Sequence, residues 1–329
     1  MKNKHVNFYS SAYLKWNEWE DELPIKVNSM KYNSNATLFT LATEKGYRIF
    51  SSKSLIMNKK ISNENKNLGN LILANTFFRS RFVFIVGNEK IYHPNELLIF
   101  DDIYGKIFSK ISFKEKEKII DFNLTLNFIF VFTETNLVVI EMNNFNIKSI
   151  INDVRLYAYN SYDMIGYLNN KENNVVYINI FNTEKHISTN IFRNSISVNF
   201  NKISNIQLSN NGNFILTVSE FGNKFHLYDL SNGELKFCLF SGQKLDSIYN
   251  IYFNNDDNAI MFVSSDNLLI IFDITTDDDF VFCNCDKMKD IKINHNKRLL
   301  DIFQKHSYEV KNLNIILFYF YRKLKIIIF

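Results

Sequence analysis

Short apolar or alternating stretches recur along the chain, separated by turns rich in Asn, Asp, Gly and Lys. Such stretches between turn-forming residues are typical of β-strands. They group into units of about forty residues, which is the length of a four-stranded β-propeller blade. The units that the pattern defines are residues 29–51, 71–113, 119–150, 153–189, 203–240 and 247–274.

This pattern predicts an all-β fold, a seven-bladed WD-repeat-like β-propeller built as a single domain from residues 1–329. The recognisable blades span about 29–274, and residues 275–329 are expected to form a divergent last blade that is weak or incomplete. Radial repetition leaves few free strand edges. A β-sandwich or two β-domains are the alternatives, which the regular period and the lack of a Pro/Gly-rich linker disfavour.

Composition agrees with a strand-rich globular protein, since 46% of the residues are hydrophobic and the chain holds 32 Phe and 17 Tyr. The net charge of +4 is scattered and forms no basic stripe, so nucleic acid is not an expected partner. Three cysteines are too few for a disulfide framework and fit a reducing compartment. Cys283 and Cys285 lack a second ligand pair, and no phosphate-binding glycine loop is present, so neither a metal nor a cofactor is expected.

The termini carry no clear targeting or membrane signal. The first residues contain no apolar signal-peptide core. Residues 313–329 are strongly apolar, but they are shorter than the ~20 residues of a spanning helix and are interrupted by Arg322, Lys323 and Lys325. Two buried strands joined at Arg322-Lys323 are predicted there, with a truncated sequence as the alternative. The chain is therefore expected to be cytoplasmic, and it is expected to be a monomer.

Four of the units contain distinctive segments. These read ATEKGYRIF in the first unit, FFRSRFVFIVG with HPNELLIFDDIYGKI in the second, NNGNFILTVSEFGNKFHLYD in the fifth, and SIYNIYF with VSSDNLLIIF in the sixth. Together they resemble the PROPPIN family, the phosphoinositide-binding seven-bladed propellers of autophagy that include the WIPI proteins. The resemblance covers about residues 29–274. It implies a propeller scaffold that recruits autophagy-type protein partners at membranes.

The resemblance also implies two phosphate pockets, served in the family by the paired arginines of an F/L-R-R-G motif. Arginine suits this role because its charged fork matches a phosphate. Here Leu239 and Gly242 match the motif, but Phe240 and Ser241 replace both arginines. Because neutral donors bind a phosphate about half as strongly, binding of phosphatidylinositol 3-phosphate and 3,5-bisphosphate is expected to be weakened. The aligned, degenerate positions are Asn199, Ser219, Asn223, His226, Phe240, Ser241, Gly242 and Ser265.

Two further regions carry expectations from the family. One edge of the second unit is where the family docks proteins, and the corresponding residues are Arg79, His93, Pro94, Asn95, Asp101 and Asp102. The loop after the sixth blade helps the family to insert into membranes. Here it begins with Thr275-Thr276 and three carboxylates, Asp277 to Asp279, which an anionic leaflet would repel. The apolar residues 280–282 that follow are interpreted as a strand rather than as an insertion.

Three hypotheses for function stay open. The first is a phosphoinositide-dependent scaffold, peripheral on endosomal, vacuolar or autophagosomal membranes, whose lipid binding is rescued by Lys202, Lys224, His226 or Lys244. The second is a lipid-independent WD-repeat scaffold that binds proteins through the second-unit edge. An enzyme is the least favoured third hypothesis, because no nucleophile–base pair or metal spacing is visible.

Overall fold

The structure is a computed structural model. It describes residues 26–34, 37–51, 57–62, 68–78, 80–88, 91–114, 117–160, 162–181, 195–240, 248–254, 256–264, 268–274 and 325–328. The regular elements in these ranges are all β-strands, so the all-β prediction is confirmed. The chain divides into two compact units, Met1–Ile150 and Ile151–Phe329.

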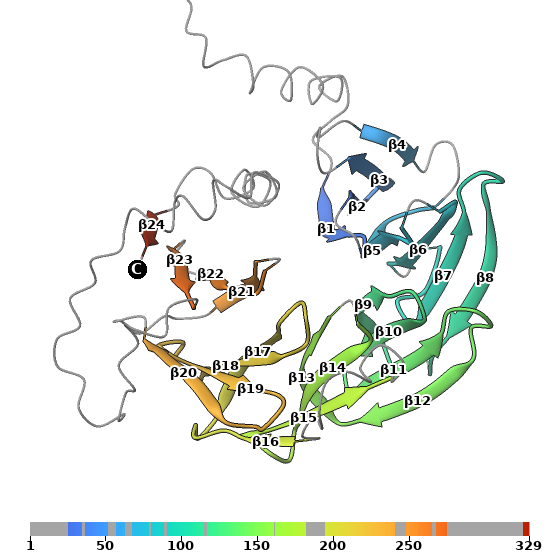
Figure 1. Cartoon of the computed structure of the whole chain (residues 1–329). Coiled ribbons are helices and arrows are strands. Elements are labelled where there is room, and N and C mark those ends of the chain that lie inside the picture. Colours follow the sequence, from blue (N-terminus) through green and yellow to red (C-terminus); the bar gives the residue numbers. More distant parts are fainter. Residues whose placement is uncertain are drawn as a thin grey trace, which may run out of the picture. The chain divides into compact units, whose positions relative to one another are not determined.

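The first unit contains three four-stranded sheets, in which consecutive strands are neighbours (Figure 1). The pairing is antiparallel, as between β2 and its neighbours β1 and β3. The first sheet consists of β1 (Val27–Tyr32), β2 (Leu38–Thr43), β3 (Gly46–Ser51) and β4 (Met57–Ser62). The second sheet consists of β5 (Leu71–Thr76), β6 (Phe82–Gly87), β7 (Glu96–Asp101) and β8 (Lys106–Ser112). The third sheet consists of β9 (Ile119–Leu124), β10 (Phe128–Thr133), β11 (Asn136–Glu141) and β12 (Ile147–Asn152).

The second unit repeats this arrangement in three more sheets (Figure 1). The fourth sheet consists of β13 (Val154–Tyr159), β14 (Met164–Asn169), β15 (Val175–Ile180) and β16 (Ser195–Ser197). The fifth sheet consists of β17 (Ile203–Leu208), β18 (Phe214–Ser219), β19 (Lys224–Asp229) and β20 (Leu235–Phe240). The sixth sheet consists of β21 (Ile248–Phe253), β22 (Ala259–Ser264), β23 (Leu268–Asp273) and β24 (Lys325–Ile328).

Strands in the middle of a sheet are buried on both faces. Every residue of β2 and of β10 is buried, although successive side chains of a strand point to opposite faces. Both faces of a sheet must therefore be covered by other parts of the chain. This explains why FIFVFT in β10 is a continuous apolar run rather than an alternating one.

On one face of β2 and of β10, the cover comes from the neighbouring sheet of the same unit. Buried apolar side chains form continuous clusters between the first and second sheets and between the second and third sheets. In the second unit, matching clusters join the fourth sheet to the fifth and the fifth to the sixth. Fully burying one such Leu, Ile or Phe side chain contributes about 1.5–3 kcal/mol. The sheets thus stabilise one another and not only themselves.

The outermost strands differ sharply from the middle ones. β8 and β12 are mostly exposed along their length. Each has one neighbouring strand in its sheet and forms the edge. A bulge in β8 leaves Phe108 without a partner on β7, because Ile99 pairs with Ser109 and Phe100 with Ile107. Bulges of this kind twist an edge and protect it from pairing with another chain.

Asparagine side chains connect consecutive sheets at the turn after the first strand. The Asn33 amide donates to the Phe78 carbonyl of the second sheet at 3.1 Å. The Asn160 amide donates to the Ser209 carbonyl of the fifth sheet at 3.3 Å, and the Asn210 amide to the Asn254 carbonyl of the sixth at 2.7 Å. A buried carbonyl left without a donor is costly. These three contacts, called here the asparagine clasps, therefore fix the register between sheets.

The clasp between the fifth and sixth sheets is reinforced by Asp257. Its carboxylate accepts hydrogen bonds from the backbone N–H of Asn210 at 2.8 Å and of Asn211 at 2.7 Å. It also accepts from the Asn210 amide at 3.0 Å. Gly212 follows with φ of 76°, and a Cβ there would lie 2.5 Å from the Met164 sulfur. The turn residues Asn210-Asn211-Gly212 are thus required both by backbone conformation and by contact with neighbouring sheets.

The last blade is where prediction and structure differ most. Lys325–Ile328 forms a strand, as expected for the segment after Arg322-Lys323, but it pairs in parallel with β23 and completes the sixth sheet. The rest of 275–324, with Cys283, Cys285 and residues 280–282, lies outside the described residues. A seventh blade and the single-domain organisation stay predictions.

We predict that Asp257→Ala lowers the free energy of unfolding by about 2 kcal/mol, because it removes three part-buried hydrogen bonds that join the fifth-sheet turn to the sixth sheet. The matched control is Asp229→Ala, whose carboxylate accepts only from Ser231 in an exposed turn. The control should cost less than about 1 kcal/mol. Chemical denaturation of both variants measures the difference, and equal costs would contradict the role of the clasp.

Candidate functional site

Three of the degenerate lipid positions, Ser219, Asn223 and Phe240, lie at one end of the fifth sheet. The buried Ser219 hydroxyl donates to the Asn223 side-chain oxygen at 3.1 Å and accepts from the Lys224 backbone N–H at 3.1 Å. Lys224 pairs in register with Phe240, which brings that position beside the same turn. The proton of Ser219 and one of its lone pairs are therefore used inside the turn, not offered to a ligand.

His226 is buried in the core of the second unit, with 2% of its surface exposed. Its ring stacks on Phe200 with centroids 4.1 Å apart, and its Nδ1 lies 3.3 Å from the Tyr228 hydroxyl. Nε2 has no hydrogen-bond partner. Desolvation first, and then the charge of Lys224, lower the pKa of His226 to about 4. The imidazole is therefore neutral and inaccessible at neutral pH, which argues against its rescuing phosphate binding.

The remaining candidates at this end add little charge for a phosphate. Lys202 forms an ion pair with Glu220 at 2.9 Å, and both side chains are about half exposed. Asn199 is exposed just after β16. Ser241, Gly242, Lys244 and Ser265 lie outside the described residues. Among the described residues at this end, Lys224 is a half-buried cation, Lys202 is paired, Ser219 and His226 are buried and neutral, and none is an arginine.

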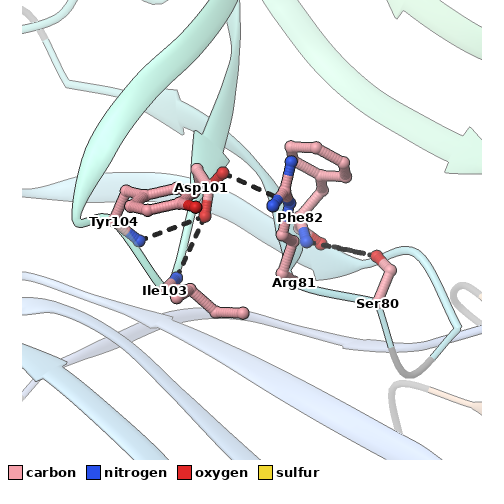
Figure 2. Close-up of polar contacts among 6 residues, drawn as sticks. All are labelled: Ser80, Arg81, Phe82, Asp101, Ile103 and Tyr104. Atoms are coloured by element: carbon pink, nitrogen blue, oxygen red, sulfur yellow. Dashed lines mark hydrogen bonds and ion pairs between the residues drawn. The ribbon is translucent and has the colours of Figure 1, made fainter.

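A second site forms at the β7–β8 turn of the second sheet (Figure 2). Asp101, which ends β7, is buried and accepts hydrogen bonds from the backbone N–H of Ile103 at 3.1 Å and of Tyr104 at 3.2 Å. Its other oxygen lies 3.3 Å from the Nε of Arg81. Gly105, at φ of 65°, donates its N–H to the Asp101 carbonyl at 2.8 Å and closes the turn. One carboxylate thus shapes the turn and positions the arginine.

The neighbouring carboxylate anchors this turn to the first sheet. The buried Tyr47 hydroxyl of β3 donates to Asp102 at 2.6 Å. Burial, followed by the hydrogen bond to Asp102, raises the pKa of Tyr47 well above its ordinary value. The hydroxyl therefore stays a donor at all physiological pH values. The pair Asp101-Asp102 has two separate structural tasks, one inside the turn and one between sheets.

The solvent side of the turn combines cations with aromatic and apolar side chains. The Arg81 guanidinium lies over the Phe82 ring at 4.9 Å and over the Tyr104 ring at 5.5 Å. The Lys106 ammonium lies 5.7 Å from the Tyr104 ring centroid. Phe82 also packs against Phe108, with centroids 5.0 Å apart. We call these residues, together with the exposed Ile103, the turn cluster: Arg81, Phe82, Ile103, Tyr104, Lys106 and Phe108.

The exposure of the turn cluster is high for such side chains. Ile103 is 68% exposed, Tyr104 66% and Phe108 54%. Large apolar residues gathered on a surface mark interaction sites more often than scattered ones do. The arrangement can therefore bind a partner through apolar contact together with charge.

The residues predicted for the docking edge fall at two ends of the second sheet. Asp101 and Asp102 lie at the turn cluster, whereas Arg79 is outside the described residues. His93 is exposed in the turn before β7, at the opposite end of that strand, and Pro94 beside it is buried. Asn95 donates to the Phe113 carbonyl at 3.0 Å, which is a structural role. Whether this set docks a partner stays a prediction.

Sequence reasoning missed Arg81, Ile103, Tyr104, Lys106 and Phe108. A signal was present in Asp-Asp-Ile-Tyr-Gly-Lys, residues 101–106, because two large apolar residues stand where a turn normally carries polar ones. The contact of Arg81 with this turn could not be seen in the sequence, since about twenty residues separate them. Elsewhere in the described ranges, no group of His, Cys, Asp or Glu is arranged to hold a metal ion. None of the described segments is a helix with the length and apolar character that crossing a membrane requires.

Comparisons with known proteins bear on the fold of this chain. No family model matches the chain. Over 134 residues it is 26% identical to Autophagy-related protein 18e of Arabidopsis thaliana, a match that covers 40% of this chain and 35% of that protein. The chain thus spans about a third of the length of this curated relative.

Solved structures extend the likeness to most of the chain. Kluyveromyces lactis Hsv2 superposes with a TM-score of 0.65 at 16% identity, over 77% of this chain and 76% of that chain. KlAtg21, solved in complex with the coiled coil of AgAtg16, gives a TM-score of 0.60 at 18% identity, over 77% of this chain and 82% of that chain. The chain has the β-propeller fold of these solved structures, and its likeness to Autophagy-related protein 18e supports the PROPPIN resemblance. The propeller fold and the resemblance predicted from the sequence are thereby confirmed, while the number of blades stays a prediction.

His226 should make the stability of this chain depend on pH. Because the folded pKa of about 4 lies below the ordinary value of 6.5, the stabilising contribution is complete above pH ~6.5 and is lost as the pH falls towards 4. We predict a loss of up to about 3 kcal/mol over this range, since each pKa unit corresponds to about 1.4 kcal/mol.

Denaturant unfolding at several pH values measures this dependence. His226→Phe should flatten it, and His93→Gln, which changes an exposed histidine, should leave it unchanged. The same pH slope in wild type and His226→Phe would show that another group is responsible.

Proposed function

We propose that this chain is a non-catalytic β-propeller scaffold in autophagy or membrane trafficking that recruits protein partners at membranes through the turn cluster. Phosphoinositide binding, expected of PROPPIN proteins, is weak or absent in it. The observation that carries the proposal is the contrast between the two sites. The second sheet exposes a large, mixed apolar and cationic surface, whereas at the fifth sheet Ser219 is bonded internally, His226 is buried and Lys202 is paired, which leaves Lys224 as the described cation.

The chemistry of the fifth sheet supports the weak lipid site. A phosphate on a solvated rim needs charge-assisted hydrogen bonds, which are about twice as strong as neutral ones. The described candidates are the internally bonded Ser219, the buried neutral His226, Lys202 in its ion pair with Glu220, and the half-buried Lys224, whose single ammonium lacks the fork of the two missing arginines. The alternative to a membrane-associated role is a scaffold that acts independently of lipid, and the same surface would serve it.

The comparisons suggest a first partner to test. KlAtg21, which shares the fold, is described in complex with the coiled coil of AgAtg16. A coiled coil of this class presents alternating apolar and charged residues along each helix. Such a surface suits the turn cluster, which offers Ile103, Tyr104 and Phe108 beside Arg81 and Lys106.

The lipid part of the proposal is tested by flotation with phosphatidylcholine vesicles that contain phosphatidylinositol 3-phosphate. We predict that the wild-type chain floats no better with these vesicles than with phosphatidylcholine alone. The double variant Phe240→Arg, Ser241→Arg should gain binding, because it restores two forked cations at the motif. Strong wild-type flotation at physiological salt would contradict weak lipid binding and favour the phosphoinositide-dependent hypothesis.

The partner part is tested with a recombinant Atg16 coiled coil and the full chain in a calorimetric titration. We predict that Ile103→Asp weakens binding by about tenfold or more, because a charge replaces an apolar contact at the centre of the cluster. Ile147→Asp is the matched control, since Ile147 is likewise exposed, at 52%, on the edge strand of the third sheet. If both substitutions weaken binding equally, the second-sheet surface is not the docking site.

A further inference from the structure

The turn cluster contains an arginine, Arg81, that its neighbours hold in position and that is partly exposed to solvent. Nε of Arg81 faces Asp101 at 3.3 Å, and the guanidinium plane lies over the Phe82 and Tyr104 rings. The contact with Asp101 is made through Nε, and the Arg81 side chain is 42% exposed. The arginine is thus oriented by its surroundings while its outer edge faces solvent.

Such an arrangement favours an anionic ligand. A guanidinium presents parallel donors that match a carboxylate, and contact with aromatic faces leaves those in-plane donors free. Because the ring contacts and Asp101 already restrict the side chain, less conformational entropy is lost on binding. The position of Arg81 therefore lowers the cost of gripping one acidic group.

The charges around the cluster support an acidic partner. The exposed cations are Arg81, Lys106 and Lys110. The nearby carboxylates already have partners: Asp101 is buried, the half-buried Asp102 accepts from the Tyr47 hydroxyl, and Glu96 is 14% exposed and paired with Lys110 at 2.9 Å. A partner that approaches from solvent therefore meets cationic groups first, which attracts acidic chains and repels basic ones.

Apolar contacts beside the arginine indicate a peptide rather than a free anion. Ile103 and Tyr104 project from the turn, and the bulge in β8 turns out Phe108, which packs on Phe82. The same bulge disfavours addition of a partner strand along β8. Recognition should therefore be by side chains. We propose that Arg81 binds a carboxylate of an acidic partner segment, whose neighbouring apolar residue packs on Ile103 and Tyr104.

This inference rests on the proposed docking function and adds the chemistry of the partner. The test uses the full chain and a fluorescein-labelled synthetic peptide of alternating Glu and Leu residues, followed by fluorescence anisotropy. The comparison peptide carries Gln in place of Glu. We expect Arg81→Gln to weaken binding of the Glu peptide by about tenfold, the size of one charge-assisted contact. The Gln peptide should bind about tenfold more weakly to the wild type and be insensitive to Arg81→Gln.

Further variants separate recognition from folding. Arg81→Lys keeps the charge but loses the fork, so it should recover only part of the affinity. Lys148→Gln is the matched control, because this cation also lies over an aromatic ring, that of Phe128 at 4.6 Å, on the third sheet. It should leave binding unchanged. Thermal unfolding identifies an unfolded Arg81 variant, and in that case Tyr104→Ala, which leaves Asp101 paired, should give the same loss.

Three results would overturn the inference. Equal binding of the Glu and Gln peptides would show that the carboxylate is not recognised. Equal binding of the Glu peptide by wild type and Arg81→Gln would show that Arg81 takes no part in binding. Binding to phosphatidylserine vesicles that depends on Arg81, without peptide binding, would identify a membrane surface instead. If the coiled coil still binds through Ile103 while the Glu peptide fails, the docking function stands and only the carboxylate inference is lost. If the coiled coil fails as well, the docking function falls with it.

Discussion

The central strands β2 and β10 depend on burial of both their faces. In these strands no residue is left exposed, so neither would be stable without other parts of the chain packed on both sides of its sheet. The apolar clusters between successive sheets of the unit supply that cover on one face of each strand. This constraint confines variation to edge strands and turns, because any polar change in a middle strand would bury an unpaired group. Function is therefore expected at the rims of the sheets.

The asparagine clasps solve a second problem created by such packing. Apolar faces can slide past one another with little change in energy, but a hydrogen bond to a particular carbonyl cannot. Asn33, Asn160 and Asn210 each connect the turn after a first strand to the next sheet. The abundance of Asn in the turns thus has a structural use in the described ranges, beyond turn formation.

The two candidate sites respond differently to the loss of charge. Binding of a phosphate headgroup relies on arginine forks. Phe240 and Ser241 stand where the motif has its two arginines, so both forks are missing here. A protein-docking surface relies more on apolar area with one or two well-placed cations. The turn cluster keeps both ingredients, and Asp101 and Asp102 hold it in place. One scaffold can therefore lose lipid recognition and keep partner recognition.

The sequence by itself determined the strands, the repeating unit and the family resemblance, because these depend on the local order of apolar and turn residues. It also located the weakened lipid motif, since Phe240 and Ser241 can be read directly. Only the tertiary structure decided that His226 is buried against Phe200, that Arg81 meets Asp101, and that Lys325–Ile328 completes the sixth sheet. Each of these contacts joins residues far apart in the chain or depends on which face of a strand is covered. Packing between elements settles such questions, and local residue preferences carry no information about it.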